Sequence, residues 1–354
     1  MEINWLWLET GYTIDNRVLT YPLIYRYVGD IKELQVFPYL ERSGRVAVKA
    51  TAIKDHGSRT VTGHLTSWES ILRRLTDSKE EFQAAVSEIP ATMVFDDLVS
   101  RIEEKYPFPR LFLFNHATFS ISIDHFAAAE YLASRHYVAV VSDSGRVDTI
   151  LRWNPQTGIW ERNGAAYIVQ ELSRIIPDEA MRILLNSTVV NNVKMALAGY
   201  RSISVEEFAR SFNDYSRYIP VANGILDMER RELLPFSPDF RFTFKLAVRF
   251  DRKAKANRIR RFIHEIAGSK EDEENILRMI GYILVPKQPL QSFFILYGTG
   301  SNGKSTLIKV LRTFLGEDLV ATRTLSDLLH NRFAFAELDG KLLNAATETP
   351  RGGH

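Results

Sequence analysis

The sequence predicts an α/β protein in which mixed α+β parts precede a smaller unit built on a strand, a glycine loop and a helix. Two observations carry this prediction. Through residues 1–288, segments of alternating or β-branched residues are interspersed with segments of helical hydrophobic period. After them, the apolar run 293–297 leads into a glycine-rich loop and a further helical period. We expect three domains, at residues 1–118, 119–288 and 289–354.

Composition excludes several classes of protein. The chain has no cysteine, so disulfides and cysteine-bound zinc are excluded. Its eight histidines lack metal-binding spacing, which predicts no histidine metal site. A net charge of +2 means that nucleic-acid binding must be argued from local patches. No apolar run approaches the ~20 residues of a membrane helix. We therefore expect no membrane partner and a cytoplasmic location.

The first part, residues 1–118, offers no motif for its role. Aromatic and β-branched residues surround a turn at Gly29–Asp30, and residues 45–53 alternate like a strand. Residues 68–86 and 95–106 show helical periods. The acidic pair Asp96–Asp97 fits the first turn of a helix, where it would face the positive end of the dipole. A metal site is the alternative.

The second part, 119–288, mixes helices with short strands. A turn at 154–158 joins strands into a hairpin, and Asn223–Gly224 marks another turn. Residues 242–250 alternate strongly, and a helical period returns over 258–285. The remaining expected elements are helices at 126–136, 165–176, 187–197 and 204–212, and strands at 137–141, 149–153 and 159–161.

The loop after the apolar run matches G-x-x-x-x-G-K-[ST], the phosphate-binding P-loop. The predicted nucleotide-binding residues are Gly298, Thr299, Gly300, Ser301, Asn302, Gly303, Lys304, Ser305 and Thr306. Its glycines let backbone N–H groups point at a triphosphate, and the following helix adds its positive N-terminal dipole. We expect Lys304 to reach the β and γ phosphates and Ser305 to bind Mg²⁺, with ATP as the nucleotide. The alternative is a glycine-rich turn with an incidental Gly-Lys-Ser.

A carboxylate follows the next predicted strand. Residues 342–346 form a plausible core strand beside the P-loop strand, and Glu348 would stand at its end near the γ-phosphate. There it could orient the attacking water or hold Mg²⁺ through water. An ordinary surface Glu is the alternative. Thr347 precedes it where an Asp is expected, which leaves direct metal binding open.

An ordered set of short elements resembles the phage/plasmid and poxvirus-type primase-helicases over about residues 120–350. These elements are Asn223–Asp227, Phe236–Asp239, Val248–Asp251, Gly281–Tyr282 and the loop Gly298–Thr306 with its Asn302. The approach from Phe333 through Lys341 to Glu348 resembles the same family.

The resemblance implies an incomplete AAA+-like P-loop NTPase core of the superfamily 3 helicase type. It implies an ATP-dependent DNA helicase or primase-helicase of a virus, plasmid or integrated element, acting in DNA replication. The family works on single-stranded or forked DNA as a ring, usually a hexamer. Residues 1–118 lack D-x-D primase carboxylates, so priming is not expected. The family's DNA hairpin, sensor and arginine finger would lie beyond residue 354, so we expect a truncated motor that binds nucleotide weakly and does not unwind DNA.

A run of basic residues raises the question of direct DNA contact. Its cations are Arg241, Lys245, Arg249, Arg252, Lys253, Lys255, Arg258, Arg260 and Arg261. Against the lone Asp251 they could hold a phosphate backbone. The alternative is a solvated face compensated by the acidic run 271–274. Two other classes of function stay open: a non-catalytic nucleotide- or DNA-binding regulator, and a small-molecule P-loop kinase.

Overall fold

A computed structural model describes residues 22–106, 110–176, 178–212, 217–284, 292–298 and 302–346. It contains 44% helix and 25% strand, so neither type dominates and the mixed α/β class is confirmed. The described residues form two compact units. One holds the residues up to Arg152 together with Asn163–Ser204, and the other holds Trp153–Arg162 and the residues from Val205 onward. The three-domain division at 118 and 288 stays a prediction.

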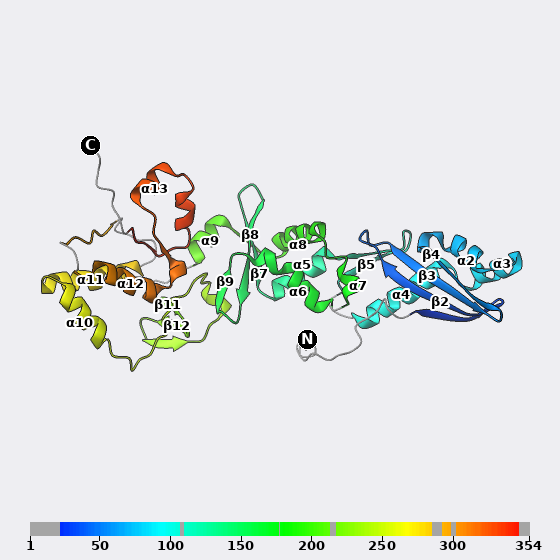
Figure 1. The fold of residues 1–354 in the computed structure, drawn as a ribbon, viewed down its shortest axis with the longest axis horizontal. Helices are drawn as coiled ribbons and strands as arrows, with labels where there is room; N and C mark the ends of the chain where they lie inside the picture. Colours follow the sequence, from blue (N-terminus) through cyan, green and yellow to red (C-terminus); the bar gives the residue numbers. More distant parts are fainter. Residues whose placement is uncertain are drawn as a thin grey trace. The chain divides into compact units, whose positions relative to one another are not determined.

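The first unit begins with a four-stranded antiparallel meander (Figure 1). Its strands are β1 (Leu23–Val28), β2 (Ile31–Leu40), β3 (Val46–Lys54) and β4 (Gly57–His64). The predicted turn at Gly29–Asp30 joins β1 to β2, and Gly29 has the positive φ of +56° that such a turn favours. The inner residues of β2 and β3 are almost completely buried, which anchors the core of this unit.

Three helices pack against this sheet: α2 (Trp68–Leu75), α3 (Lys79–Glu88) and α4 (Ala91–Lys105). The prediction of one helix over 68–86 is wrong, because the chain breaks at 76–78 and starts again. The break has a local cause. Ser78 caps α3 by accepting from the N–H of Glu81 at 3.0 Å, and the Glu81 carboxylate accepts from the N–H of Asp77 at 2.6 Å.

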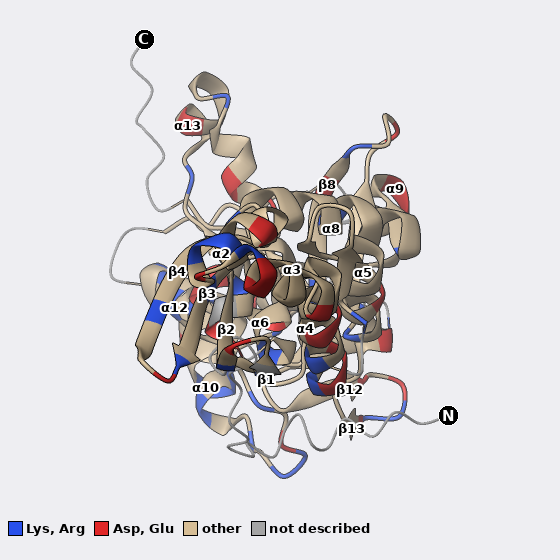
Figure 2. Ribbon diagram, turned by 90° about the vertical axis from the view of Figure 1, so that its right-hand side faces the viewer, with Lys and Arg blue, Asp and Glu red and all other residues tan. Residues whose placement is uncertain are grey.

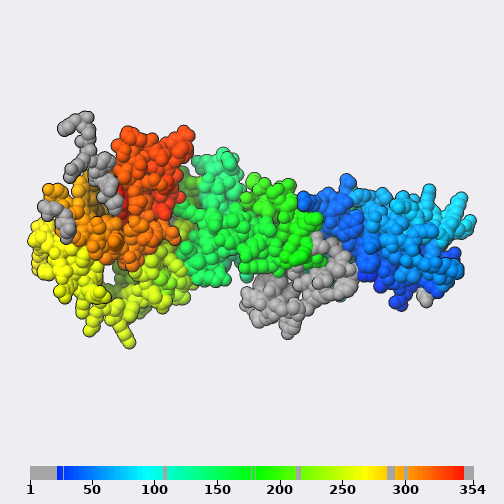
Figure 3. Space-filling model, viewed as in Figure 1, coloured from blue at the N-terminus to red at the C-terminus, as the bar shows by residue number. Residues whose placement is uncertain are grey.

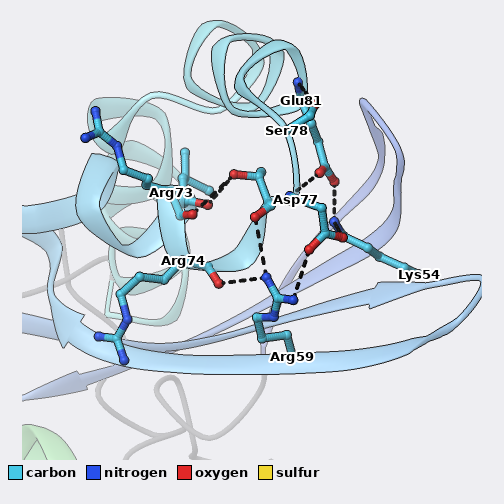
Figure 4. A network of polar contacts seen from close by, with 9 residues as sticks. Lys54, Arg59, Arg73, Arg74, Asp77, Ser78 and Glu81 are labelled. Atoms are coloured by element: carbon cyan, nitrogen blue, oxygen red, sulfur yellow. Dashed lines mark hydrogen bonds and ion pairs between the residues drawn. The ribbon is translucent and has the colours of Figure 1, made fainter.

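A polar network fixes this break onto the sheet (Figure 4). Lys54 on β3 reaches Glu81 at 2.6 Å and Asp77 at 2.7 Å, and Arg59 on β4 reaches Asp77 at 2.9 Å. Partial burial opposes the charge of Lys54, but its hydrogen bonds to Asp77 and Glu81 outweigh that effect and raise its pKa. The hydrogen bond from Lys54 lowers the pKa of Asp77. The Glu81 side chain is only 2% exposed, so its pairing with Lys54 is a largely buried contact.

The sequence predicts that the acidic pair Asp96–Asp97 lies in the first turn of a helix, and this prediction is wrong. Helix α4 begins at Ala91, directly after Pro90, which puts the pair in its second turn. Asp96 instead faces His116 at 3.1 Å, and Asp97 accepts from the Tyr25 hydroxyl at 2.7 Å. Among the described residues, no group of three or more His, Cys, Asp or Glu could hold a metal ion.

The rest of the first unit surrounds a second sheet. Its helices are α5 (His125–Ser134), α6 (Ile168–Ile175), α7 (Glu179–Arg182) and α8 (Ser187–Tyr200). Strands β5 (Phe112–Asn115) and β6 (Ser120–Ile123) pair with each other in a separate two-stranded sheet. The second sheet contains β7 (Tyr137–Val141), β8 (Val147–Asn154) and β10 (Ser202–Ser204). Strand β7 pairs antiparallel with β8 and parallel with β10, and α5 and α8 pack together beside it. The helices and strands predicted here are confirmed.

The second unit opens with short strands. The end of β8 turns through 154–158 into β9 (Ile159–Glu161), as predicted. Helix α9 (Val205–Ser211) precedes a three-stranded meander of β11 (Tyr218–Val221), β12 (Gly224–Asp227) and β13 (Glu232–Leu234). A turn joins β11 to β12 where the sequence predicts one, but it is formed by Ala222 and Asn223, because Gly224 already pairs with Val221 as the first residue of β12.

The alternating segment 242–250 forms no regular strand and contains bends at 243, 247 and 248. Phe242, Phe244 and Leu246 are buried, so the predicted alternation of burial is confirmed. Its backbone groups bond to several elements instead of one neighbour. The Leu246 N–H donates to Pro220, and the Ala247 N–H donates to Leu315. Asn223 adds a side-chain clamp, with two hydrogen bonds of 3.1 and 2.9 Å to the backbone of Phe250.

Asp227, the last residue of β12, is buried and accepts several hydrogen bonds that stabilise the hairpin. It accepts from Arg217 at 2.8 Å and from the N–H groups of Glu229 and Arg230 at 3.0 and 3.2 Å. The hydrogen bond from Arg217 lowers the pKa of Asp227, against the opposing effect of burial. Asn223 and Asp227 open and close one of the short elements quoted above, and both have structural roles here.

Four further helices lie in the described part of the second unit (Figure 1), and the first three of them contribute side chains to its hydrophobic core. They are α10 (Asn257–Ile266), α11 (Lys270–Ile283), α12 (Lys304–Leu315) and α13 (Leu325–His330). Leu307, Leu311 and Leu315 of α12 are buried, and the helix ends at Gly316, whose φ is +105°. Ser269 caps α11 by accepting from the N–H of Asp272 at 3.1 Å. Within the described residues, no helix is both long and apolar enough to cross a bilayer.

The prediction of a buried strand over 293–297 is wrong. Residues 292–298 have no regular structure, and Phe293, Ile295 and Tyr297 are 81, 76 and 93% exposed. A core strand needs ladder partners as well as apolar side chains, and no described strand pairs with this segment. Strand β15 (Leu343–Asn344) is shorter than the predicted 342–346 and pairs in parallel with β14 (Val320–Ala321).

Replacing Lys54 tests the network of Figure 4. We expect Lys54→Met to lower the free energy of unfolding of the first unit by about 3 kcal/mol, because it leaves the Glu81 carboxylate buried without its cation. The matched control is Lys32→Met, which breaks the exposed Lys32–Asp55 pair and should cost under about 1 kcal/mol. Urea denaturation measures both. Equal losses would contradict the role given to Glu81.

Acid stability tests the Asp227 contact. Its lowered pKa means that the contact stabilises the fold above the ordinary value of 3.8 and that this stability is lost as the pH falls through the folded value. We expect Asp227→Asn to lower the melting temperature at pH 7 by several degrees and to flatten its decline below about pH 4. Glu229→Gln removes the exposed carboxylate on the same arginine and should change little. If the melting temperatures of wild type and Asp227→Asn declined equally below pH 4, the result would argue against this contact.

Candidate functional site

The first turn of α12 carries Lys304, Ser305 and Thr306 of the P-loop motif at a helix end that no side chain caps. Gly303 precedes the helix with φ +84°, and no side chain caps it. The N–H groups of Lys304, Ser305 and Thr306 have no acceptor within the helix. Ser305 and Thr306 are also exposed. Three donors and the positive end of a twelve-residue helix are therefore available to an anion.

Gly303 is required for two independent reasons. Its φ lies in the left-handed region, which costs other residues about 1–2 kcal/mol. A Cβ at this position would also lie 2.5 Å from Cγ2 of Ile266, on the last turn of α10. The helix end and α10 can approach this closely only because position 303 has no side chain.

The Lys304 ammonium is held inside the loop. Its Nζ donates to the Gly298 carbonyl at 3.0 Å and to the Asn302 side-chain oxygen at 2.6 Å. These contacts bring Gly298, Asn302 and Lys304 together. Asn302 is exposed, so an incoming anion can replace its oxygen as the partner of Lys304. The structure thus places a cation beside the open N–H groups.

A cavity of about 1080 Å³ adjoins this cation. One wall comes from α11, another from residues 292–297, and Asn302, Lys304 and Leu307 close one side. The α11 wall offers apolar Ile276 and Met279 beside polar Asn275 and Arg278. The cavity therefore combines an apolar body with a cationic side, which suits a ligand that has a flat apolar part and a charged part.

Aromatic rings mark the apolar part of this cavity. Tyr282 of α11 and Phe294 meet edge to face, with ring centroids 6.1 Å apart. Sequence reasoning did not assign α11 to the site, because its residues precede the motif by more than a helix length. The available signal was the Gly281–Tyr282 element, which places an aromatic side chain on α11 just before the loop.

Several predicted site residues lie outside the described residues: Thr299, Gly300, Ser301 and Glu348. Their roles stay predictions, as do the roles of Ser305 and Glu348 in binding Mg²⁺. Ser305 stands in the first turn of α12, where its hydroxyl is accessible. The side chains that this part of the structure presents fit a phosphate-bearing ligand.

Two family models match parts of the chain. Residues 128–268 match the model described as D5 N terminal like, which is the N-terminal region of phage and viral primase-helicase proteins. This match ends just before Ser269, the cap of α11. Residues 296–353 match a family of unknown function (DUF5906). No curated protein matches the chain. The first match associates the chain with replication proteins, and the second assigns no activity to the P-loop segment.

Replacing Gly303 tests the geometry of the helix end. We expect Gly303→Ala to lower the free energy of unfolding of the second unit by about 2 kcal/mol, from left-handed strain and the clash with Ile266. Gly281→Ala is the matched control, because it lies inside α11 with no atom within 4 Å of the added methyl group. It should stabilise α11 by about 0.5–1 kcal/mol. The denaturation midpoints of the two variants should shift in opposite directions. A shift in the same direction would contradict the requirement for glycine at position 303.

Proposed function

We propose that the second unit binds ATP with Mg²⁺ and serves as the motor end of a DNA helicase or primase-helicase that replicates a virus, plasmid or mobile element. The observation that carries the proposal is the pairing of an uncapped α12 N-terminus with Lys304 beside the cavity. The helix end and the ammonium neutralise the phosphates. The apolar, aromatic part of the cavity accommodates the base.

The match of residues 128–268 supports the replication part of the proposal. Primase-helicases act on DNA, so single-stranded or forked DNA is the polymer we propose as substrate. A P-loop motor hydrolyses ATP between neighbouring subunits, which makes a ring, usually a hexamer, part of the same proposal. Glu348 would activate the water, and Ser305 would hold the metal ion.

Lys304→Ala tests nucleotide binding. We expect it to weaken the affinity for Mg·ATP by about ten-fold or more, because it removes the ammonium that contacts the phosphates. Lys309→Ala is the control, since it deletes the same charge from the exposed side of the same helix. Isothermal titration calorimetry measures both affinities, and turnover of ATP is followed in parallel.

The outcomes separate the competing functions. Loss of ATP binding in Lys304→Ala alone supports the proposal, and DNA-stimulated turnover in wild type supports the motor. Binding without turnover would favour a non-catalytic regulator. Transfer of phosphate to a metabolite would favour a kinase. Equal affinities in the two variants would contradict the nucleotide site itself.

A further inference from the structure

A basic surface lies on α10 and on the loop that leads into it. We define it by six exposed cations: Arg249, Arg252, Lys253, Lys255, Arg258 and Arg260. Figure 2 shows Lys and Arg in blue along α10, and Figure 3 shows the yellow segment that includes α10 at the surface of the molecule. Within the described parts of the chain, none of the six has an ion-pair partner. Six positive charges on a short stretch of chain attract a polyanion.

The other cations of this run are already occupied. Arg241 contacts Ser211 at 3.0 Å and Glu207 at 3.7 Å, and Lys245 donates to the carbonyl of Thr157 at 2.6 Å. Arg261 pairs with Glu265 at 2.8 Å, one turn further along α10. The structure thus separates three engaged side chains from six that are free to meet a ligand.

The acidic run at the start of α11 does not pair with the basic surface. Asp272 accepts from Ser269 in the helix cap at 2.8 Å, Glu273 faces His264 at 3.2 Å, and Glu274 faces Arg278 at 3.2 Å. These contacts engage three of the four acids at the α11 start, and Glu271 forms no ion pair with any of the six cations among the described residues. These contacts therefore do not support the alternative in which the acidic run 271–274 neutralises the basic residues.

Chemistry favours a nucleic acid over a lipid surface. The apolar side of α10 is already used, because Ile263 is buried and Phe262 and Ile266 pack on the second core. A helix that binds membranes needs that side for insertion. Four of the six cations are arginines, whose planar guanidinium groups bind phosphate oxygens in pairs. Cations distributed along a loop and a helix suit a flexible phosphate chain.

We propose that this basic surface binds the phosphate backbone of single-stranded DNA, independently of base sequence. The proposal rests on the proposed replication role for the identity of the polymer. It does not depend on nucleotide binding at Lys304. The surface acts as a second, electrostatic contact for DNA beside the motor, and its affinity therefore falls steeply with salt.

A charge-matched pair of triple variants tests the proposal. The first replaces Arg252, Lys255 and Arg258 by Gln. The second replaces Arg42, Lys49 and Lys79 by Gln, which are exposed cations of the first unit without an ion-pair partner among the described residues. Both variants lose the same net charge. The probe is a fluorescent oligo(dT), and its affinity is measured by anisotropy over a range of salt concentrations.

We expect only the first variant to bind oligo(dT) at least ten-fold more weakly at low salt. Its slope of log affinity against log salt should fall by about 2, since each phosphate neutralised contributes about 0.7 in single strands. Equal binding by the two variants would overturn the proposal. Loss of binding to phosphatidylserine vesicles, with oligo(dT) binding unchanged, would also overturn it and indicate a membrane.

Two controls separate this proposal from the nucleotide site. The first variant should retain the wild-type affinity for Mg·ATP, and Lys304→Ala should retain the wild-type affinity for oligo(dT) in the absence of ATP. If Lys304→Ala keeps ATP binding but the first variant loses DNA binding, the nucleotide proposal fails and the basic surface stands. The reverse result rejects the basic surface alone.

Discussion

The close approach of Gly303 to Ile266 is the constraint on which the candidate site depends. It seats the first turn of α12 against the last turn of α10, at a distance that no side chain at position 303 would permit. The other end of α12 is fixed as well, because the Leu315 carbonyl accepts from the N–H of Ala247. Buried leucines hold the helix between these two points. Lys304, which lines the cavity, is therefore held in place together with the open N–H groups of the first turn of α12.

This arrangement separates two electrostatic tasks within the second unit. The α12 end presents oriented N–H groups and one ammonium, which suit a compact triphosphate. The basic surface on α10 presents mobile guanidinium and ammonium groups, which suit an extended polymer. Helix α10 contributes to both, since Ile266 contacts the P-loop side while Arg258 and Arg260 face solvent. Nucleotide and DNA would thus contact different surfaces of elements that share one core.

Much of the fold follows from the sequence, because periodicity reports burial. The alternation of 242–250, the leucines of α12 and the helices α10 and α11 all lie where their patterns predict. Turn chemistry was equally informative at Gly29 and Asn223. The break at 76–78 could have been recognised from Ser78 followed by Glu81, a capping box inside an apparently continuous period. Strand β4, which begins at Gly57, has its β-branched residues Thr60, Val61 and Thr62 in a row and buries only Val61, so no alternation predicts it.

The failures concern properties that a local pattern does not contain. Five apolar residues at 293–297 predict a strand only if other strands flank them, and pairing is a property of the whole sheet. The site shows the same limit. The motif identified Lys304 and Gly303, but α11 joined the site through tertiary packing, which brings Tyr282 to Phe294. Spacing in the sequence indicates which residues bind phosphate, and the fold decides what surrounds them.

Hydrogen–deuterium exchange over residues 302–307, with and without Mg·ATP, tests the central claim most directly. We expect the N–H groups of Lys304, Ser305 and Thr306 to exchange rapidly in the free protein, because no helical acceptor protects them. We also expect marked protection when ATP is bound, with little change in the α5–α8 region. Unchanged exchange in this first turn at saturating Mg·ATP would contradict the claim that α12 receives the phosphates.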